Sequence, residues 1–536
     1  MKKYSKALAI MAASTLAAVG LAACSSGGSS SSGSGTQVIT ANGCEPQNPL
    51  VPSNTTETCG GRVIDLINSG LVYFDADGNL HNDLAESIDH DGALYTVKLR
   101  DGIEFSDGTP ITSESFVKAW NFTVANALTN ESFFEPIVGY QEVADKTATE
   151  MSGLQIVDDS TFTIELTQPE ADFPLRLGYS AFYPLPDSAY DGSEDLAAYG
   201  NAPLASGPYK LESWDHNIGL TLVPNENYTG ANKPKNDGIK FVFYSKQDSA
   251  YADLQSGNLD VLDQIPDSAF STYMDDLDGR GVNQASAVFQ SFTVPSKLEH
   301  FGNDEEGKLR RQALSMAVDR ESIVEKIFAG TRTPATDFTS PVIAGHSDSL
   351  AGAEVLEYNP EKAKELWAEA DAISPWSGTF TLAYNADGGH QAWVDAATNS
   401  IKNTLGIDAV GKPYPDFKSF RTDVRNRTIG SAFRTGWQAD YPGLGNFLEP
   451  LYSTGASSND GDYSNAEFDA LIKQAAGAAS VDESNSYYNQ AQEILLQDLP
   501  AIPLWYSNVN GGWSDRVSNV KFNWKSVPVY TDITVK

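Results

Sequence analysis

The side chains that most often take part in catalysis are scattered along this chain. Six histidines occur in 536 residues, and none stands at the spacing of a helical metal site such as His-Glu-x-x-His. We find no Gly-x-Ser-x-Gly elbow, no Walker-type phosphate loop and no dinucleotide-binding glycine pattern. Carboxylates are abundant, as an acidic surface requires, so a hydrolytic Asp/Glu pair stays an alternative. We expect no enzyme, no metal site and no cofactor.

Cys24 is the residue with the clearest chemistry, because a thiol directly after small residues is the nucleophile that diacylglyceryl transfer needs. It closes the run Leu-Ala-Ala-Cys, which follows a lysine-rich start and an apolar stretch over residues 7–20. This lipobox-like arrangement predicts a signal peptide at 1–23, cleavage before Cys24 and lipid on its sulfur. An ordinary secretory signal with a cysteine after the cleavage site is the alternative.

Residues 24–36 predict a flexible tether between this lipid and the folded protein. Residues 25–35 are all serine or glycine, which bury no apolar surface, so the fold is expected to begin near Gln37. No later segment has the roughly 18 consecutive apolar residues of a membrane helix. Lipid is therefore the only membrane attachment that we expect.

The other two cysteines, Cys44 and Cys59, form an even pair in an oxidising compartment, which favours a disulfide. Such a bond closes a loop of about 15 residues and stabilises the fold by up to about 3 kcal/mol on the loop-entropy model. A pair of metal-binding thiols is the alternative, but no second cysteine or histidine cluster lies nearby.

The formal net charge of −35 excludes nucleic acid as an expected partner, because phosphate binding needs a basic face. It also disfavours anionic lipid surfaces, and solubility outside a cell explains it simply. Hydrophobic residues make up 41% of the chain, enough for packed cores. The chain is longer than a single hydrophobic core usually supports, so about two or three lobes are expected.

Strands and amphipathic helices are interspersed without a fixed repeat, which predicts a mixed α/β (α+β) fold. Alternating apolar residues predict half-buried strands at 95–99 and 162–166, and a further strand is expected at 379–384. Four helices are predicted from caps and apolar spacing. They are 321–329 between Asp319 and Gly330, the helix opened by Asn359 and Pro360, 391–405 before Gly406, and the helix from Asp482 to about 497.

Residues 95–120 combine a strand, two Asp-Gly turns and a helix capped by Thr112 or Ser113. This segment resembles the signature of extracellular solute-binding protein family 5, the peptide and nickel binding proteins of ABC importers. Further segments resemble the family in the family's order, and the resemblance covers about residues 37–536. These segments are 207–214, 225–228, 254–260, 311–320 and 498–506.

The resemblance implies a periplasmic-binding-protein-like fold with two lobes, a hinge, a central cleft and an extra subdomain in the first lobe. The expected boundaries are 37–60, 185–292 and 506–536 for lobe I, 61–184 for its inserted subdomain and 293–505 for lobe II. The chain is expected to cross between the lobes near residues 290 and 505.

The function that the resemblance implies is capture of peptides, chiefly oligopeptides, outside the cell. Closure of the cleft around the cargo would let the protein dock on the permease of an ABC transporter with cytoplasmic ATPases. The protein is expected to be a monomer on the extracellular face of the membrane of a Gram-positive bacterium, where a lipid replaces confinement by a periplasm. Other members bind nickel chelates, oligosaccharides or opines, so a non-peptide cargo is the alternative.

Residues 433–442 resemble the cargo-site segment of oligopeptide-binding members, in which the acid of a Trp-x-Ala-Asp-Tyr motif pairs with the peptide's free α-amino group. Here that acid is Asp440, and Trp437 would form a flat wall of the site. A buried ammonium needs a carboxylate partner, since an unpaired charge in a closed cleft is costly. The alternatives are a turn acid beside Pro442 and a core tryptophan.

Arg425, Arg434 and His390 occupy positions resembling the basic residues that meet the peptide carboxylate in relatives. Surface arginines are common, so a structural role is the alternative for each arginine. Phe417 falls, with a shift of one residue, where relatives can have a tryptophan lining the site. We expect one of the basic residues to bind the cargo's carboxyl end.

The segment around Glu45 and Gln47 resembles the strand that runs along the bound peptide in relatives. Its main-chain groups would pair with the peptide backbone, a mode that grips any sequence. Pro46 removes one donor from this strand, so the ladder is expected to be shorter than in relatives. A second departure is the apolar run at 442–445, which changes the rim of the site.

Overall fold

The computed structural model describes residues 37–170, 172–190, 192–415, 417–456 and 458–536. The predicted signal peptide, Cys24 and the tether lie outside these residues. The first described strand, β1, spans Val38–Gly43 and lies in the interior of the largest sheet.

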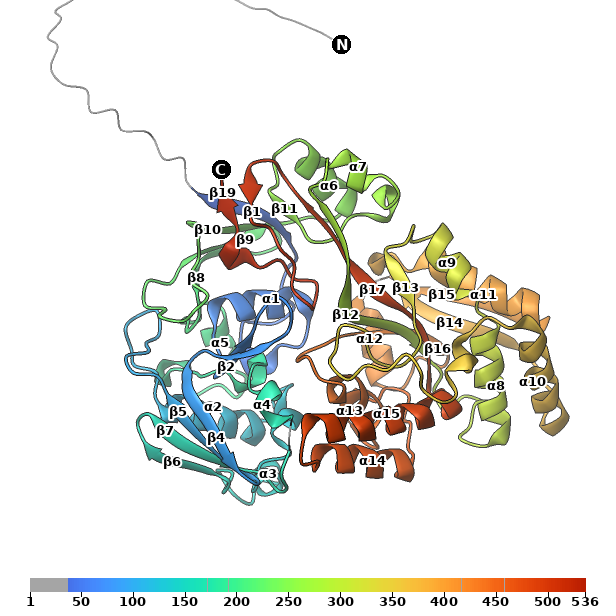
Figure 1. The fold of residues 1–536 in the computed structure, drawn as a ribbon, viewed down its shortest axis with the longest axis horizontal. Helices are drawn as coiled ribbons and strands as arrows, with labels where there is room; N and C mark the ends of the chain where they lie inside the picture. Colours follow the sequence, from blue (N-terminus) through green and yellow to red (C-terminus); the bar gives the residue numbers. More distant parts are fainter. Residues whose placement is uncertain (1–36, 171, 191, 416, 457) are drawn as a thin grey trace, which may run out of the picture. The chain divides into compact units, whose positions relative to one another are not determined.

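Two antiparallel strands of 13 residues each, β12 (Gly281–Thr293) and β17 (Ala501–Trp513), run through the middle of an eleven-stranded sheet. The strand order is β15-β14-β16-β12-β17-β11-β1-β10-β9-β8, and β13 pairs with β17. The two long strands therefore belong to both halves of the sheet, as Figure 1 shows near its centre. The crossings expected near residues 290 and 505 fall within them, while the lobe boundaries stay predictions. The remaining strands are β8 (Tyr209–Asp215), β9 (Gly219–Pro224), β10 (Gly238–Phe243), β11 (Val261–Leu262), β13 (Arg332–Pro334), β14 (Thr379–Asn385), β15 (Asp408–Tyr414) and β16 (Ala432–Gln438).

A separate four-stranded antiparallel sheet has the order β4-β5-β7-β6. The strands predicted from alternation are confirmed as β5 (Leu94–Leu99) and β7 (Thr161–Glu165), whose alternate apolar residues are buried. The helix α2 (Ser113–Ala125) packs the rings of Phe116 and Trp120 against Phe162. The other strands outside the large sheet are β2 (Val72–Phe74), β3 (Leu80–Asn82), β4 (Ala85–Asp91), β6 (Leu154–Asp158), β18 (Val517–Ser518) and β19 (Thr534–Val535).

Capping residues set most of the predicted helix boundaries. The helix α10 spans Pro360–Ile373 with Asn359 as its N-cap, and the predicted apolar stripe is buried. The helix α11 spans Gln391–Leu405 and ends at Gly406, whose φ of 71° lies in the left-handed region that favours glycine. Thr112 forms the capping box of α2.

Two helix boundaries differ from the prediction. The helix α15 (Val481–Asp498) is capped by Ser480, whose hydroxyl accepts the Glu483 N–H, so the prediction of Asp482 as the cap was wrong. Asp482 instead lies in the first turn, where a negative charge favours the helix dipole. The helix α9 (Arg320–Lys326) starts after Asp319 as predicted but ends before Gly330 is reached.

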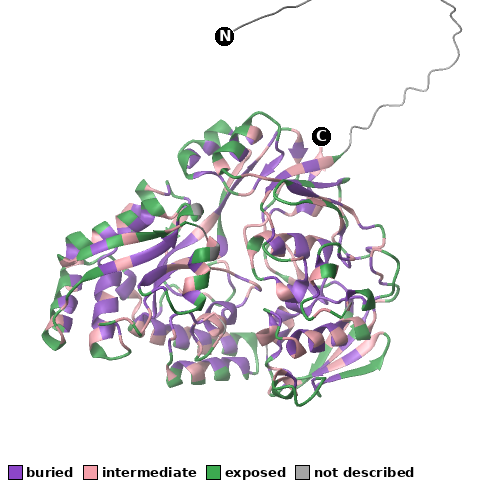
Figure 2. Cartoon of the chain, turned by 180° about the vertical axis from the view of Figure 1, so that it is seen from behind, coloured by how far each residue is buried: buried purple, intermediate pink, exposed green. Residues whose placement is uncertain are grey.

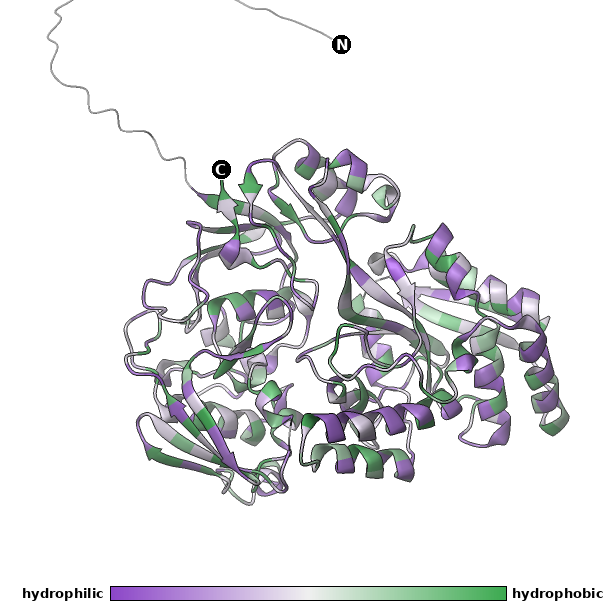
Figure 3. Ribbon diagram, in the orientation of Figure 1, coloured by the Kyte–Doolittle hydropathy of each residue, from purple (hydrophilic) through white to green (hydrophobic). Residues whose placement is uncertain are grey.

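Helices cover the β14–β15 half of the large sheet, with α11 packed on both strands and α10 packed against α8 and α11. Figure 2 shows the buried faces of these helices toward the strands and exposed faces outside, and Figure 3 shows the matching alternation of hydropathy. The remaining helices are α1 (Thr58–Ile67), α3 (Tyr140–Ala144), α4 (Phe173–Arg176), α5 (Ala197–Gly200), α6 (Gln247–Gln255), α7 (Tyr273–Asp276), α8 (Glu305–Met316), α12 (Phe417–Arg425), α13 (Gly445–Tyr452) and α14 (Ala466–Ala476).

Cys44 and Cys59 form a disulfide in the structure, with their Cα atoms 5.3 Å apart. The bond ties the residue after β1 to the first turn of α1. We expect replacement of both cysteines by serine to lower the free energy of unfolding by up to about 3 kcal/mol, because the unfolded chain then regains the entropy of the open loop. Urea unfolding of the two proteins measures the difference. Equal midpoints for the oxidised protein and the double variant would contradict this expectation.

Candidate functional site

Asp440 lies just past the end of β16, where one amide fixes its position. Asn446 donates from Nδ2 to Asp440 Oδ2 at 2.9 Å, and its Oδ1 accepts the Asp440 N–H at 2.9 Å. The same Oδ1 accepts the indole N–H of Trp437 at 2.9 Å. Asn446 is 1% exposed and sits in the first turn of α13. The carboxylate, the main chain and the indole are therefore held as one unit.

The apolar run at 442–445 has a packing reason at its last residue. A Cβ at Gly445 would lie 2.5 Å from the hydroxyl oxygen of Tyr488 on α15. Glycine therefore lets α13 begin close to α15, and in this position Asn446 can form its hydrogen bonds with Asp440.

Burial raises the pKa of Asp440 to about 6, while the hydrogen bond from Asn446 and the charge of Lys525 act in the opposite direction. Tyr179 also lowers this pKa by hydrogen bonding, and the charge of Asp65 raises it. The side chain is half-buried. At neutral pH, above this pKa, the Asp440 carboxyl is mostly ionised, and because burial disfavours its charge, a cationic partner is favoured.

Asp65, Tyr179 and Lys525 approach Asp440 from three distant parts of the chain. Asp65 belongs to α1, Tyr179 follows α4, and Lys525 lies in the turn at 523–527. All three are half-buried. By the boundaries expected from the sequence, all three belong to lobe I or its subdomain, and Asp440 belongs to lobe II.

Arg434 and Phe417 lie together at the other end of β16. Arg434 Nε donates to Asn385 Oδ1 at 2.8 Å, and its guanidinium carbon lies 5.2 Å from the ring centre of Phe417 and 5.5 Å from that of Phe420. Guanidinium groups stack favourably on aromatic faces, so these rings fix the direction of the charge. The structure thus brings together two of the residues predicted to lie at the cargo site.

His390 has a strongly lowered pKa, so its imidazole is neutral near pH 7, and its predicted role at the cargo's carboxyl end stays a prediction. Burial lowers its pKa to about 3, and the charges of Arg434 and Arg332 lower it further. Its Nδ1 accepts the indole N–H of Trp393 at 3.1 Å. His390 can therefore donate one hydrogen bond from Nε2, but it brings no positive charge to a carboxylate.

Arg425 is exposed at the last position of α12, and its carbonyl oxygen accepts from Arg427 Nη1 at 3.4 Å. The guanidinium of Arg434, by contrast, is half-buried against rings. The role predicted for Arg425 at the cargo's carboxyl end stays a prediction.

Glu45 and Gln47 do not lie on a strand in the structure. The strand β1 ends at Gly43, before the disulfide. Glu45 accepts the Asn217 N–H at 2.8 Å and the Trp214 indole N–H at 3.4 Å, so it is bound to the β8–β9 hairpin. The Gln47 N–H donates to Glu57 Oε1 at 3.1 Å. Their predicted main-chain contacts with cargo stay a prediction.

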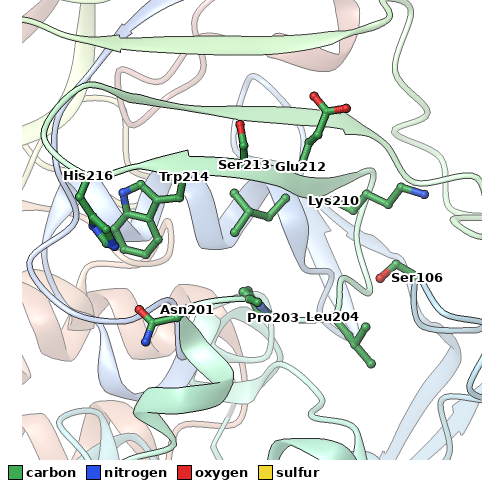
Figure 4. A pocket seen from close by; sticks show the side chains of 11 residues that line it. Ser106, Asn201, Pro203, Leu204, Lys210, Glu212, Ser213, Trp214 and His216 are labelled. Carbon is green, nitrogen blue, oxygen red and sulfur yellow. The ribbon is translucent and has the colours of Figure 1, made fainter.

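A surface pocket of about 350 Å³ lies beside the β8–β9 hairpin, between β8 and residues 201–204 (Figure 4). Trp214 and His216 form one of its walls, and Lys210 and Glu212 lie along the same strand. Neither Asp440 nor Arg434 lines this pocket. The side chains suited to bind both ends of a peptide therefore lie outside this pocket.

The edge of β16 is a feature that sequence reasoning missed. The strand pairs with β12 over residues 433–438, whereas β14 pairs with it only at Ala432 and Phe433. Within the described residues, no strand pairs with the other edge of 434–438. The hydrophobic pattern of β16 did not indicate this unpaired edge, because the pattern of one strand does not reveal where its neighbour ends.

In the part of the chain that the structure describes, the histidine, cysteine and acidic side chains include no group of three or more arranged to bind a metal ion. None of the helices in this part of the chain has the length and apolarity needed to cross a membrane.

Comparison with known proteins gives the family. The sequence profile of the bacterial extracellular solute-binding proteins, family 5 (middle region), matches residues 79–459. The dipeptide-binding protein DppE of Bacillus subtilis (strain 168) is 26% identical over 485 residues, which cover 89% of this chain and 88% of DppE. These matches confirm the resemblance found in the sequence.

Solved structures show the same fold. The murein tripeptide binding protein MppA of Escherichia coli has a TM-score of 0.80 at 23% identity and covers 93% of this chain and 98% of its own. Haemophilus influenzae OppA in complex with the peptide RPPGFSPFR has a TM-score of 0.79 at 22% identity, covering 93% of this chain and 99% of its own. The fold is the expected mixed α/β architecture with two lobes.

Proposed function

Because the chain belongs to the bacterial extracellular solute-binding proteins, family 5, we propose that it captures peptides outside the cell and delivers them to an ABC importer. The observation that supports a peptide cargo most strongly is the Asp440 carboxylate, half-buried at the end of β16 and aligned by Asn446. The family and the compared proteins are binding proteins, which agrees with the absence of a catalytic motif from the sequence.

The proposed role of Asp440 is to bind the α-ammonium of the peptide. A carboxylate that is removed from water gains more from a cation than an exposed carboxylate gains, since the local dielectric is lower. Such charge-assisted hydrogen bonds are about twice as strong as neutral ones. They also fix one end of the ligand without contacting its side chains, which permits many sequences.

The open edge of β16 supports a second set of contacts. A peptide added along residues 434–438 would pair its main chain with that of the strand, so that affinity does not depend on sequence. Arg434 and Asp440 are six residues apart, about 20 Å along an extended strand. A peptide of about six residues could therefore reach both charges, with its carboxylate at Arg434.

Closure of the two lobes would complete the site. Asp65, Tyr179 and Lys525 approach the carboxylate from the expected lobe I, so cargo contacts from both sides would favour the closed form. In this proposal the closed protein docks on the permease as a monomer, and lipid on Cys24 keeps it at the extracellular face of the membrane. No cofactor and no nucleic acid take part.

Native mass spectrometry of the purified protein tests the proposed cargo. We expect the protein to release peptides on denaturation, or to take up members of an equimolar mixture of tri- to hexapeptides and return them intact. Retention of a sugar, a nickel chelate or an opine in preference to every peptide would overturn the proposal. Hydrolysis of the added peptides would show a peptidase instead.

Peptide affinity should fall as the pH drops below about 6, because the ammonium needs the ionised form of Asp440. Each unit below that pKa should raise Kd by about tenfold. The effect on stability has the opposite sign. Since the folded-state pKa lies above the ordinary 3.8, the stability from this group is present below about pH 4 and is lost as the pH rises through about 6.

Isothermal titration at several pH values, with the tightest-binding member of the peptide mixture, measures this dependence. The Asp440→Asn variant is the matched control and should show a flat profile over the same range. A profile for the unmodified protein that is as flat as that of the variant would contradict the assignment.

A further inference from the structure

Lys525 lies near Asp440, in a turn that hydrogen bonds hold to three other segments of the chain. The Trp524 N–H donates to the Ala76 carbonyl at 2.9 Å, and the Trp524 carbonyl accepts the Ala287 N–H at 2.7 Å. The Lys525 carbonyl accepts from Gln438 Nε2 at 2.5 Å. The turn is thus bound to the β2–β3 connection, to β12 and to β16, so the position of Lys525 is determined by the fold.

Asp65 pairs with Lys525 across 460 residues of sequence. The ammonium Nζ lies 2.8 Å from Asp65 Oδ2, and Tyr183 donates to Asp65 Oδ1 at 3.2 Å. The two side chains are 24% and 34% exposed, Lys525 being the less exposed. The ion pair is therefore partly shielded from water and from salt, unlike a surface pair.

Lys525 also lies within electrostatic reach of Asp440. The charge of Lys525 lowers the pKa of Asp440, and the charge of Asp440 raises the pKa of Lys525. The titratable groups that interact with Asp440 are thus one further carboxylate, one ammonium and the neutral phenols of Tyr179 and Tyr441. Two acids and one cation leave a surplus of one negative charge, which matches a single incoming ammonium.

We propose that Asp65 is a specificity-determining residue, which keeps Lys525 paired so that Asp440 stays available for the free amino terminus of the cargo. This inference rests on the proposed function. An ammonium that belongs to the chain has a far higher effective concentration than a peptide in solution. Without Asp65, Lys525 would bind Asp440 and would compete with every cargo. With cargo bound, two carboxylates face two ammonium groups, and the site is neutral.

Three variants test the proposal by isothermal titration with the tightest-binding member of the tri- to hexapeptide mixture. Asp65→Asn should weaken binding by at least about tenfold, because Lys525 then turns to Asp440. Adding Lys525→Met to this variant should restore affinity to within about threefold of the unmodified protein, since the competitor is gone. Lys525→Met alone should bind at least as tightly as the unmodified protein.

An ion pair of the same residue types provides the matched control. Lys235 and Asp532 lie 2.6 Å apart on the surface, away from the proposed cargo contacts. Asp532→Asn and the double variant Asp532→Asn/Lys235→Met should both bind peptide as the unmodified protein does. Urea unfolding of every variant shows whether the fold is retained.

The pH profile separates this role from a purely structural one. In Lys525→Met the pKa of Asp440 should rise further, so the pH at which affinity falls should move upward. If Asp65→Asn does not fold, this shift decides the question. The proposal is overturned if Asp65→Asn binds normally, if Lys525→Met fails to rescue it, or if the profile does not move. Failure of the unmodified protein to bind any peptide would instead overturn the proposed function.

Discussion

Replacement of Asp440 by asparagine should weaken the binding of peptides with a free amino terminus by about 100-fold, a loss of about 3 kcal/mol. The substitution keeps the shape of the side chain, and the new amide oxygen can still accept from Asn446. What is lost is the negative charge opposite the ammonium. Isothermal titration with the tightest-binding member of the peptide mixture measures the change.

The same variant should be at least as stable as the unmodified protein. Because burial raises the pKa of Asp440, its ionised form opposes folding at neutral pH, and a neutral amide removes that cost. Loss of affinity together with unchanged or increased stability is the pattern of a binding residue. Asp89→Asn, at an exposed position of β4, is the control and should change neither quantity. Binding by Asp440→Asn within about threefold of the unmodified protein would contradict the assignment.

Replacement of Arg176 by methionine should lower the free energy of unfolding by about 3–5 kcal/mol above neutral pH. Arg176 is 7% exposed, and its Nη2 lies 2.9 Å from Glu449 Oε2 and 3.6 Å from Glu170 Oε2. Asp172 and Tyr488 complete this buried network, in which Tyr488 donates to Glu449 Oε1 at 2.5 Å. Removal of the arginine leaves three carboxyl groups without the cation that the structure places among them.

The loss should shrink as the pH falls. Burial raises the pKa of Glu170 to about 7 and also raises that of Glu449. The stability from protonating Glu170 is therefore present below about pH 4.5 and is lost as the pH rises through about 7. Urea unfolding at both ends of this range measures the difference between the variant and the unmodified protein.

Glu449→Gln is the matched variant of the same network. It removes one acid from a cluster that has more acids than cations, so it should cost less than Arg176→Met at neutral pH. Arg176 lies on α4 in the expected subdomain, and Glu449 lies on α13 in the expected lobe II, so the network joins these two parts. Peptide affinity should therefore fall together with stability. A loss below about 1 kcal/mol for Arg176→Met would show that this network contributes little.

The sequence predicted best those helices and strands whose boundaries depend on neighbouring residues. The helix α11 was predicted to the residue, because apolar spacing and Gly406 are both read within one segment. The N-cap of α15 was not predicted correctly, since Ser480 and Asp482 are both good capping residues. Which of them caps the helix depends on how the helix packs in the folded protein. Asp440 was singled out by its motif and by the need of a buried ammonium for a carboxylate, and its role stays a prediction.

Contacts between distant residues explain what the sequence could not predict. Lys525 and Asp65 are 460 residues apart, so no spacing or periodicity connects them. The hydrogen bonds that bind the Glu45 carboxylate to the β8–β9 hairpin also join residues about 170 positions apart, and no local pattern indicated them. The neutral state of His390 depends on its burial near two arginines, and neither burial nor proximity is visible in the run Gly-Gly-His.

The central claim is that a free amino terminus is what Asp440 recognises, and one measurement on the unmodified protein tests it directly. The affinity of the tightest-binding peptide is compared by isothermal titration at neutral pH with that of its N-acetylated form. The two ligands have the same residues, but the acetylated one carries an amide and a small acetyl group in place of the ammonium. We expect acetylation to raise Kd by about 100-fold. Equal affinity for both forms would contradict the claim.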